Sequence, residues 1–373
     1  MKRIVLVGYY GCGNLGDEAI LTALCRQWTR SYENLDLTIV ASSAAGVSKH
    51  VLGFSRVRII QNPNIPTSPR FAFGTVRTAD LVVIGGGGLL TDLWTQTLLN
   101  FGWPAWVGKL TDVPVMGYGL GIGPLKTMLG RTLCRSILSS FDCMTVRDSD
   151  SLRLATKLTR SKVRAELGSD PVFLLDVPME RSGGSKRIDV RGAKVGVFPR
   201  FLPSQMLERQ MGEKEVATAW ISLLGDLGAR YGMKPTVMVL NKMEDGEHCE
   251  FIARSARCDV SYVDDYQSLI RQIQGFDLCI GMRLHSLIFS LMCEKPFIAV
   301  SYLPKVRSFS EDAGMGNYCI TLSDFVSARD SLSLIDDMLA DMSELGSILR
   351  EARIRAVRRA LVSEKMVAEI LFG

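Results

Sequence analysis

The sequence predicts an α/β protein made of two Rossmann-like domains. Apolar, strand-like runs end in glycine-rich loops, as at Lys2–Val7, where a loop with several glycines follows. A helical pattern comes next, with apolar residues at helical spacing over Asp17–Arg30. The alternation of strand, loop and helix runs through the chain twice. This is typical of two parallel sheets, each covered by helices.

The length and composition are those of a globular protein. A chain of 373 residues can form two cores, and 47% hydrophobic with 22% charged residues excludes a largely disordered chain. No run is long enough to span a membrane, and polar residues follow Met1–Gly8 too soon for a signal peptide, so we expect a cytoplasmic protein. The net charge of +5 suits anionic small substrates or a membrane surface, and no aromatic-basic motif indicates a nucleic-acid partner.

The nine cysteines contain no CxxC pair, which indicates reduced thiols rather than a disulfide framework or a zinc site. The histidines are isolated and the carboxylates show no metal-loop spacing, so the sequence predicts no metal. It indicates no oligomeric state.

Several strands of the first half are expected to end in glycines. After the first strand we expect strands at Leu37–Val40, Leu81–Ile84, Val113–Gly119 and Asp142–Val146. Two of them run into the glycines of residues 85–88 and 121–123. Glycines at the carboxyl ends of parallel strands let backbone N–H groups approach a ligand; the alternative is that they only form tight turns.

The first loop also contains Gly11-x-Gly13-x-x-Gly16, so a dinucleotide site is one interpretation. That interpretation requires an acidic residue at the end of the second strand, where it would hold a ribose. The strand instead runs into residues 41–43, Ala-Ser-Ser, and Asp36 lies before its start. The pattern therefore argues against a dinucleotide site.

Residues 179–193 are predicted to form a linker, which places one domain at residues 1–178 and the other at residues 194–346. The second domain repeats the alternation, with strands at Lys194–Phe198, Pro235–Leu240, Val260–Val263, Phe276–Ile280 and Pro296–Ser301, and with helices at Glu213–Tyr231, Cys249–Arg257 and Tyr266–Gln274. Residues 347–373 are predicted to form a basic C-terminal helix, with Leu349, Ile354, Val357, Leu361 and Val362 on its apolar side. It could dock on the protein with a solvated basic face, or lie on a membrane of anionic lipid.

The stretch from Gly281 to Ser286 is the strongest candidate for an active centre. A strand that enters a helix through Gly281 places free helical N–H groups at the sheet edge, where they stabilise an anion. Arg283 adds a forked cation for carboxylate or phosphate, and His285 can gain or lose a proton near neutral pH. The other two histidines, His50 and His248, do not lie at such a junction.

With these residues identified, the chain resembles the polysaccharide pyruvyl transferase family, in particular its bacterial cell-wall members of the CsaB type. The matching stretches span nearly the whole chain in family order: Gly8–Glu18, Gly85–Asp92, Gly121–Pro124, Val146–Asp148, Gly168–Pro171, Gly281–Ser286 and Val300–Lys305. The resemblance implies a GT-B-like fold with the active site in the interdomain cleft. It also implies transfer of a pyruvyl group from phosphoenolpyruvate to a sugar of a cell-wall or exopolysaccharide precursor, with a cyclic ketal formed and phosphate released.

The resemblance and the residue chemistry together imply a donor side in the second half and an acceptor side in the first. The expected donor-binding residues are Arg283, Leu284, Arg200, Lys305, Arg147 and Gly281. The expected acceptor-binding residues are Gly13, Asn14, Asp17, Glu18, Gly87 and Asp92. His285 is the candidate general acid or base, the alternative being a phosphate-binding histidine, and Asp17 could deprotonate the attacking hydroxyl or only bind it. Phosphoenolpyruvate is a co-substrate, and no cofactor is expected.

Two other function classes stay open at this point. The first is a nucleotide-sugar-dependent glycosyltransferase on the same GT-B architecture. The second is a non-catalytic carbohydrate-binding relative, although a mere binder has little need for a proton-transfer group among anion-binding cations. A cytoplasmic enzyme of surface polymers could act on a lipid-linked acceptor at the inner face of the membrane, which leaves peripheral membrane association open.

Overall fold

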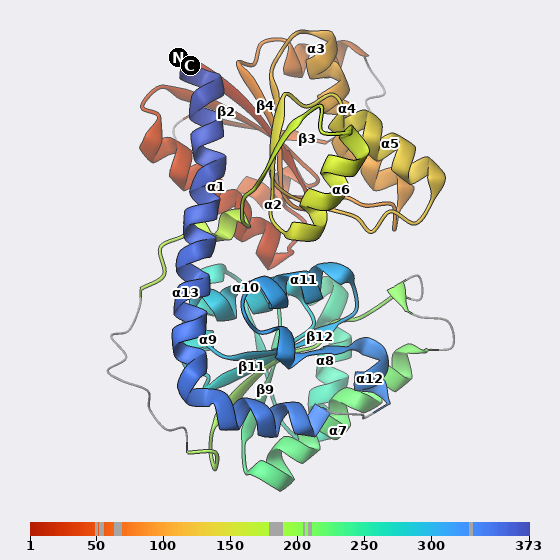
Figure 1. The fold of residues 1–373 in the computed structure, drawn as a ribbon, viewed down its shortest axis with the longest axis vertical. Helices are drawn as coiled ribbons and strands as arrows, with labels where there is room; N and C mark the ends of the chain where they lie inside the picture. Colours follow the sequence, from red (N-terminus) through yellow and green to blue (C-terminus); the bar gives the residue numbers. More distant parts are fainter. Residues whose placement is uncertain are drawn as a thin grey trace. The chain divides into compact units, whose positions relative to one another are not determined.

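The computed structural model describes residues 1–48, 51, 56–62, 69–178, 189–203, 206–207, 211–327 and 331–373 (Figure 1). The chain forms two compact units: unit 1 is Met1–Leu175 with Ala356–Gly373, and unit 2 is Asp176–Arg355. Each unit contains one parallel sheet, which confirms the predicted fold class of two Rossmann-like α/β domains. Residues 179–188 of the predicted linker, and His50, lie outside the described residues.

Unit 1 contains a seven-stranded parallel sheet of the order β3-β2-β1-β4-β5-β6-β7. Its strands are β1 (Lys2–Gly8), β2 (Leu35–Ala41), β3 (Val57–Gln61), β4 (Leu81–Leu90), β5 (Val115–Ile122), β6 (Cys143–Val146) and β7 (Arg164–Leu167). Its helices are α1 (Leu15–Ser31), α2 (Ala44–Ser48), α3 (Pro69–Val76), α4 (Thr95–Leu110), α5 (Met128–Leu138), α6 (Ser149–Thr159) and the 3₁₀ turn η1 (Pro171–Leu174). The strand order reverses between β1 and β4, and such sheets bind ligands beyond the carboxyl ends of the strands at this point.

Unit 2 contains a six-stranded parallel sheet of the order β10-β9-β8-β11-β12-β13. Its strands are β8 (Lys194–Phe198), β9 (Lys234–Val239), β10 (Asp259–Tyr262), β11 (Leu278–Gly281), β12 (Phe297–Ser301) and β13 (Cys319–Thr321). Its helices are α7 (Glu213–Tyr231), α8 (Lys242–Ala256), α9 (Tyr266–Gln274), α10 (Leu284–Met292), α11 (Pro304–Asp312), α12 (Leu322–Val326) and the turn η3 (Gly316–Tyr318). Here the order reverses between β8 and β11, which places a second ligand-binding edge at their carboxyl ends.

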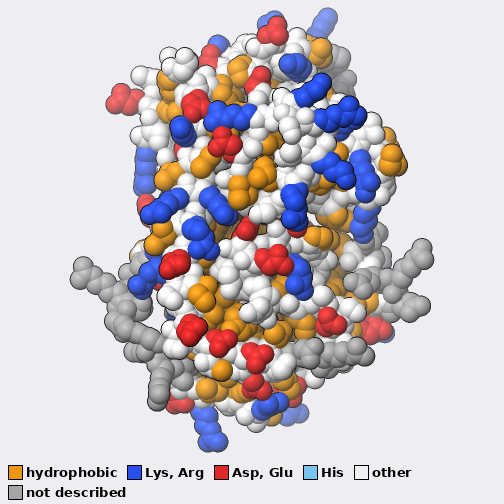
Figure 2. All heavy atoms as spheres, viewed as in Figure 1, with side chains coloured by type: hydrophobic (Ala, Val, Ile, Leu, Met, Phe, Trp, Pro, Cys, Tyr) orange, Lys and Arg blue, Asp and Glu red, His pale blue; other side chains and the backbone are white. Residues whose placement is uncertain are grey.

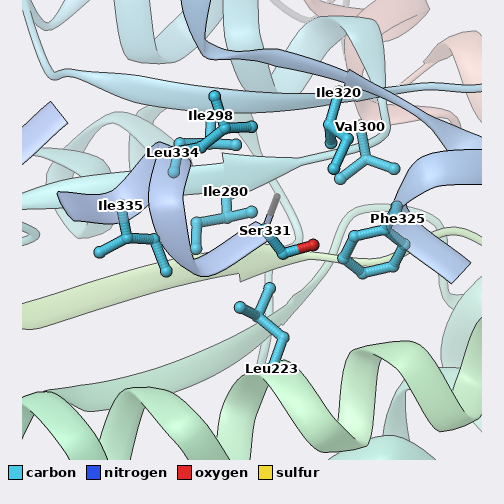
Figure 3. A pocket seen from close by; sticks show the side chains of 9 residues that line it. All are labelled: Leu223, Ile280, Ile298, Val300, Ile320, Phe325, Ser331, Leu334 and Ile335. Carbon is cyan, nitrogen blue, oxygen red and sulfur yellow. The ribbon is translucent and has the colours of Figure 1, made fainter. Parts of the chain in front are cut away.

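The central strands are buried on both faces, because helices cover the sheet of each unit (Figure 1). Every residue of β5 is buried, for example, which explains why the strands have near-continuous apolar runs rather than alternating patterns. The core of unit 2 includes a small cavity between β11, β12, β13 and the helices around them (Figure 3). Its lining is apolar except for Ser331: Leu223, Ile280, Ile298, Val300, Ile320, Phe325, Ser331, Leu334 and Ile335. It is therefore a packing gap without the convergent polar groups of a ligand site.

The strands predicted to end at Ile84 and Gly119 continue through the glycines that follow. β4 includes residues 85–88 and β5 includes Gly121, so these predicted strand ends were wrong, and the alternative that the glycines only form tight turns does not hold there either. A side chain at Gly85 would lie 2.5 Å from the carbonyl oxygen of Tyr118, which means that glycine is needed for the close approach of the two strands. The pairing of β4 and β5 shifts register beyond Gly87, as expected of a bulged strand.

The C-terminal helix, α13 (Ser331–Phe372), begins well before the predicted residue 347. Its last part docks in unit 1: Glu364 accepts a hydrogen bond from Trp28 Nε1 (3.1 Å) and another from the Tyr118 hydroxyl. The two chain ends lie side by side in unit 1 (Figure 1). The segment is thus a docked helix. Two residues of its predicted apolar side were wrongly assigned, because Ile354 is 39% and Leu361 48% exposed. None of the described helices is both long and apolar enough to cross a membrane.

Candidate active site

The carboxyl ends of four neighbouring strands in unit 2 gather a cluster of charged side chains. Arg200 follows β8, Arg283 follows β11, and Lys305 is the second residue of the helix after β12. The first turn of α8, after β9, adds Glu244 and Asp245. The sheet therefore brings together three of the residues predicted to bind the donor, at the point where its strand order reverses.

The junction between β11 and α10 has the predicted form, because the strand ends at Gly281 and the helix begins at Leu284. Arg283 is its N-cap residue, and His285 lies in its first turn, where unpaired helical N–H groups and the helix dipole favour an anion. Gly281 ends the strand, and a side chain there would lie 2.4 Å from Ser286 Oγ. That hydroxyl donates to the carbonyl oxygen of Arg283 (2.6 Å), so a glycine at 281 allows the tight connection.

Arg283 is almost fully buried and held by two carboxylates. Its Nε lies 2.5 Å from Asp245 Oδ2, and its Nη2 lies 2.8 Å from Glu244 Oε2. Burial alone would lower the pKa of Arg283, but the Asp245 and Glu244 carboxylates outweigh it and raise the pKa above its ordinary value. Asp245 is fully buried and also accepts a hydrogen bond from the backbone N–H of Phe201 (3.1 Å), which ties the arginine to the end of β8.

Arg200 and Tyr302 form the second part of the cluster. Arg200 Nη1 donates to the Tyr302 hydroxyl, and the centre of its guanidinium lies 5.1 Å from the centroid of the Tyr302 ring. Arg200 Nη2 lies 3.9 Å from Glu244 Oε2, the same oxygen that contacts Arg283. Glu244 thus bridges the two arginines, and its side chain is 44% exposed.

The Tyr302 hydroxyl reports a strongly positive environment. Burial would raise the pKa of this phenol, but the charges of Lys305, Arg200 and Arg283 outweigh it and lower the pKa to about 8. Three cations around one phenol are chemically suited to an anion, because planar guanidinium groups pair with carboxylate or phosphate through two parallel hydrogen bonds.

Three residues of this cluster were not predicted as site residues: Glu244, Asp245 and Tyr302. The sequence predicted that this helix begins at Cys249, whereas α8 begins at Lys242. Glu244 and Asp245 were therefore assigned to a loop. The available signal was Asn241, an N-cap residue whose side chain accepts hydrogen bonds from the N–H groups of Met243 and Glu244. Tyr302 lay in a matched stretch without an expected role.

The remaining histidine that the structure describes does not compete with His285. His248 lies in α8 with its Nδ1 3.4 Å from Glu213 Oε1. Burial lowers its pKa below the ordinary value, although Glu213 and Asp245 act in the opposite direction. Leu284, predicted to bind the donor, is only 6% exposed. Its role therefore stays a prediction.

In unit 1 the predicted acceptor residues meet where the strand order reverses between β1 and β4. Asn14 Nδ2 donates to Asp17 Oδ2 (2.5 Å), and Asp17 is buried. The other carboxylate oxygen faces Gly87, where a side chain would lie 2.9 Å from Asp17 Oδ1. Gly87 also has φ +95°, so both its conformation and its contact with Asp17 require glycine.

The first glycine loop closes on a carboxylate of its own chain. Glu18 Oε1 accepts hydrogen bonds from the N–H groups of Gly11 (2.8 Å) and Gly13 (3.3 Å). In a dinucleotide site such N–H groups face the pyrophosphate, and a carboxylate in that place opposes it. β2 begins at Leu35, which places Asp36 at the amino end of the strand, far from the ribose position. Both observations argue against a dinucleotide site.

Asp92, another predicted acceptor residue, is used to hold a loop. Its carboxylate accepts hydrogen bonds from Lys126 N (2.7 Å), Thr127 N (2.6 Å) and Thr127 Oγ1 (2.8 Å), just before α5 begins. Burial would raise its pKa, but these hydrogen bonds outweigh it and lower the pKa below the ordinary value. Its acceptor role stays a prediction.

Arg147, predicted to bind the donor, belongs to unit 1 rather than to the unit 2 cluster. Its Nη1 lies 3.0 Å from Asp170 Oδ2 and its Nε 3.8 Å from Asp148 Oδ2, in a buried ion-pair network. The structure therefore records Arg147 in pairs with carboxylates, and its predicted donor role stays a prediction. Within the described part of the chain, no group of three His, Cys, Asp or Glu side chains is placed to hold a metal ion.

Comparisons with known proteins identify relatives of the whole chain. The family model of polysaccharide pyruvyl transferases matches residues 14–304. The amylovoran biosynthesis protein AmsJ of Erwinia amylovora is 21% identical over an alignment of 423 residues, which covers 99% of each chain. Among solved structures, S. aureus MnaA in complex with UDP has a TM-score of 0.64 at 11% identity, over 99% of this chain and 96% of that one. Sucrose-phosphate synthase of Thermosynechococcus elongatus has a TM-score of 0.56 at 12% identity, over 99% of each chain. These structural likenesses show that the fold is GT-B-like.

Proposed function

The chain belongs to the polysaccharide pyruvyl transferase family, and we propose that it transfers a pyruvyl group from phosphoenolpyruvate to a sugar of a cell-wall or exopolysaccharide precursor. Family and fold make it a transferase that modifies polysaccharides. The observation that carries the finer proposal is the cluster of Arg200, Arg283 and Lys305 around Tyr302 in unit 2.

The cluster suits the two anionic groups of phosphoenolpyruvate. A carboxylate and a phosphate on one small carbon frame need several cations at short range, and arginine binds both through two donors at once. Asp245 fixes the guanidinium of Arg283, so less side-chain freedom is lost when the donor binds. The first turn of α10 adds backbone N–H groups and a favourable dipole beside these cations.

In the proposed reaction, His285 is the general acid. Its imidazolium gives a proton to the methylene carbon of the donor, which forms a C–H bond and leaves a cation-like centre on the neighbouring carbon. A sugar hydroxyl adds there and loses its proton, and the C–O bond to phosphate breaks with the electron pair leaving on phosphate. A second sugar hydroxyl then adds, loses its proton and closes the ketal. General acid–base catalysis of this kind typically contributes roughly 10²–10⁴-fold in rate.

We place acceptor binding on unit 1, at the reversal between β1 and β4. Asp17 is the candidate for accepting a proton from the attacking hydroxyl, because Asn14 holds one of its oxygens and Gly87 leaves space beside the other. Gly13 is exposed in the same loop, and Glu18 fixes that loop through its backbone. We propose that the protein acts in the cytoplasm, that the acceptor is lipid-linked and that no cofactor takes part.

The test is to incubate the protein with phosphoenolpyruvate and a set of lipid-linked or free precursor sugars, and to measure released phosphate and the mass of the sugar. We expect phosphate release that requires a sugar, with a ketal on the product. His285→Ala should abolish turnover and retain donor binding, while Arg283→Ala should lose both. Transfer of a sugar from a nucleotide sugar, without use of phosphoenolpyruvate, would replace this proposal with the glycosyltransferase alternative.

A further inference from the structure

Helix α5 presents large apolar side chains to solvent at its amino end. Met128 is 77% and Leu129 60% exposed, although the opposite face of the helix is buried through Cys134 and Ile137. Trp94, the N-cap residue of α4, is 48% exposed. These three side chains are not needed for the core, and a folded protein seldom keeps such a group in water without a use for it.

The start of α4, which carries Trp94, and the start of α5, which carries Met128 and Leu129, are tied together. Asp92, two residues before Trp94, accepts hydrogen bonds from Lys126 N and Thr127 N, directly before Met128. A side chain at Gly130 would collide with Asp92, which shows how closely the start of α5 approaches the start of α4. We call Trp94, Met128 and Leu129 the α4–α5 tip.

Cations outnumber carboxylates in the stretch of chain that carries this tip. Lys126, Arg131 and Arg135 are exposed on or beside α5. From residue 93 to residue 141 the chain has a single carboxylate, that of Asp112. In Figure 2 several blue Lys and Arg side chains, with orange hydrophobic ones between them, lie over the part of unit 1 that contains α5 and α6.

We propose that the α4–α5 tip and the cations beside it bind the surface of an anionic lipid bilayer. Aromatic and long apolar side chains next to Lys and Arg, with almost no carboxylates, form the pattern of an interfacial membrane contact. The charge opposes a second copy of the chain as the occupant, because a symmetric dimer would place these cations against the same cations. An anionic bilayer meets both requirements, since it accepts the apolar tip and neutralises the cations.

The position of the α4–α5 tip suggests what the membrane contact is for, and this part of the inference rests on the proposed function. Trp94 lies between β4 and α4, and Met128 and Leu129 begin the helix that follows β5, so the tip lies toward the carboxyl edge of the sheet that carries the proposed acceptor residues of unit 1. A sugar linked to a lipid in the same bilayer would stay close to that edge. The membrane contact therefore lies in unit 1 beside the proposed acceptor site, rather than on the basic face of α13.

The experiment is flotation of the full chain with vesicles of phosphatidylcholine alone or with added phosphatidylglycerol, without any substrate. We expect binding to the anionic vesicles and little to the neutral ones. Arg131→Glu with Arg135→Glu should weaken the partition coefficient at least about five-fold for each cation removed. Met128→Ser with Leu129→Ser should weaken it by at least about ten-fold.

Matched controls separate this surface from other exposed groups. Phe251→Ser removes an apolar side chain of unit 2 that is 56% exposed, and should leave vesicle binding unchanged. The double substitution Arg355→Glu with Arg358→Glu removes cations of α13. It should lower vesicle binding by less than Arg131→Glu with Arg135→Glu does. Circular dichroism and thermal unfolding check that each variant is folded.

Three outcomes would overturn the proposal. The first is equal vesicle binding by wild type and both α5 variants. The second is loss of vesicle binding only in the α13 variant. The third is that wild type binds no vesicles and instead forms a concentration-dependent dimer, which the double substitution Met128→Ser with Leu129→Ser abolishes. Phosphoenolpyruvate binding by the α5 variants is measured in parallel and should equal that of wild type. If the chain binds anionic vesicles through α5 but does not bind phosphoenolpyruvate, the proposed function fails and the membrane contact stands.

Discussion

Glu244 occupies the face of the arginines that a donor anion needs. One of its carboxylate oxygens lies 2.8 Å from Arg283 Nη2 and 3.9 Å from Arg200 Nη2. Its side chain is 44% exposed, so it can turn toward solvent when another anion arrives. We therefore expect Glu244→Gln, which removes the charge and keeps the shape, to tighten the binding of phosphoenolpyruvate.

The magnitude follows from the charge that the substitution removes. Two unit charges about 4 Å apart interact by about 1 kcal/mol in water and about 4 kcal/mol at the effective dielectric constant of a protein surface. Because Glu244 is nearly half exposed, solvent screening places the effect at the lower end, about 1–2 kcal/mol. This corresponds to a dissociation constant about 5- to 30-fold lower than that of wild type.

Equilibrium dialysis with labelled phosphoenolpyruvate measures this constant directly, and Asp245→Asn is the matched control. Asp245 is fully buried and fixes Arg283 from the side away from solvent, so its loss should weaken binding rather than strengthen it. If Glu244→Gln weakens binding five-fold or more, Glu244 orients the arginines for the donor and the competition argument is wrong.

Substitutions at three further positions test other parts of the structure. The pKa of Tyr302 is lowered from about 10 to about 8, so ionisation of its phenol stabilises the fold above pH 10 and this contribution is lost as the pH falls through 8. Two pKa units correspond to about 3 kcal/mol, so the free energy of unfolding of wild type should rise by about that amount over this range relative to Tyr302→Phe, as measured by urea unfolding. Glu364→Ala should lower the free energy of unfolding by about 2–4 kcal/mol, because it leaves the buried Trp28 and Tyr118 donors without an acceptor. Glu364→Gln should lower it by less. Equal losses in the two variants would contradict the role of Glu364 as the acceptor of these hydrogen bonds. Gly87→Ala should lower the free energy of unfolding by at least about 1–2 kcal/mol, since φ of Gly87 is +95° and the new methyl group would collide with the carboxylate of Asp17. An unchanged midpoint of urea unfolding would show that β4 can relax at this position.

The sequence was sufficient to predict the parallel sheets and to single out the three cations that cluster in unit 2. Buried parallel strands form continuous apolar runs, which predicted the two sheets. The resemblance supplied Arg200, Arg283 and Lys305, and these residues follow three neighbouring strands whose carboxyl ends share one edge. The carboxylates that hold them were missed. The first turn of α8 contains mostly polar residues, so hydrophobic periodicity does not mark it, and only its N-cap residue Asn241 indicates the helix start.

The glycines of β4 show a second limit of sequence reasoning. A run of four glycines predicts a turn when only local conformation is considered. Gly85 is instead required by a tertiary contact, the approach of the Tyr118 carbonyl on the neighbouring strand, which the local sequence does not encode. The docking of α13 also depends on a tertiary contact. A glutamate such as Glu364 is expected on the surface from its sequence alone, but in the structure Trp28 and Tyr118 donate hydrogen bonds to it.

The central claim is that the cation cluster of unit 2 is a site for phosphoenolpyruvate. The most direct test is isothermal titration of the purified chain with phosphoenolpyruvate and, separately, with UDP, repeated on Arg283→Ala. The account predicts binding of phosphoenolpyruvate that the substitution abolishes, and no binding of UDP. Binding of UDP without phosphoenolpyruvate would contradict it and identify the chain as a nucleotide-sugar enzyme on the same fold.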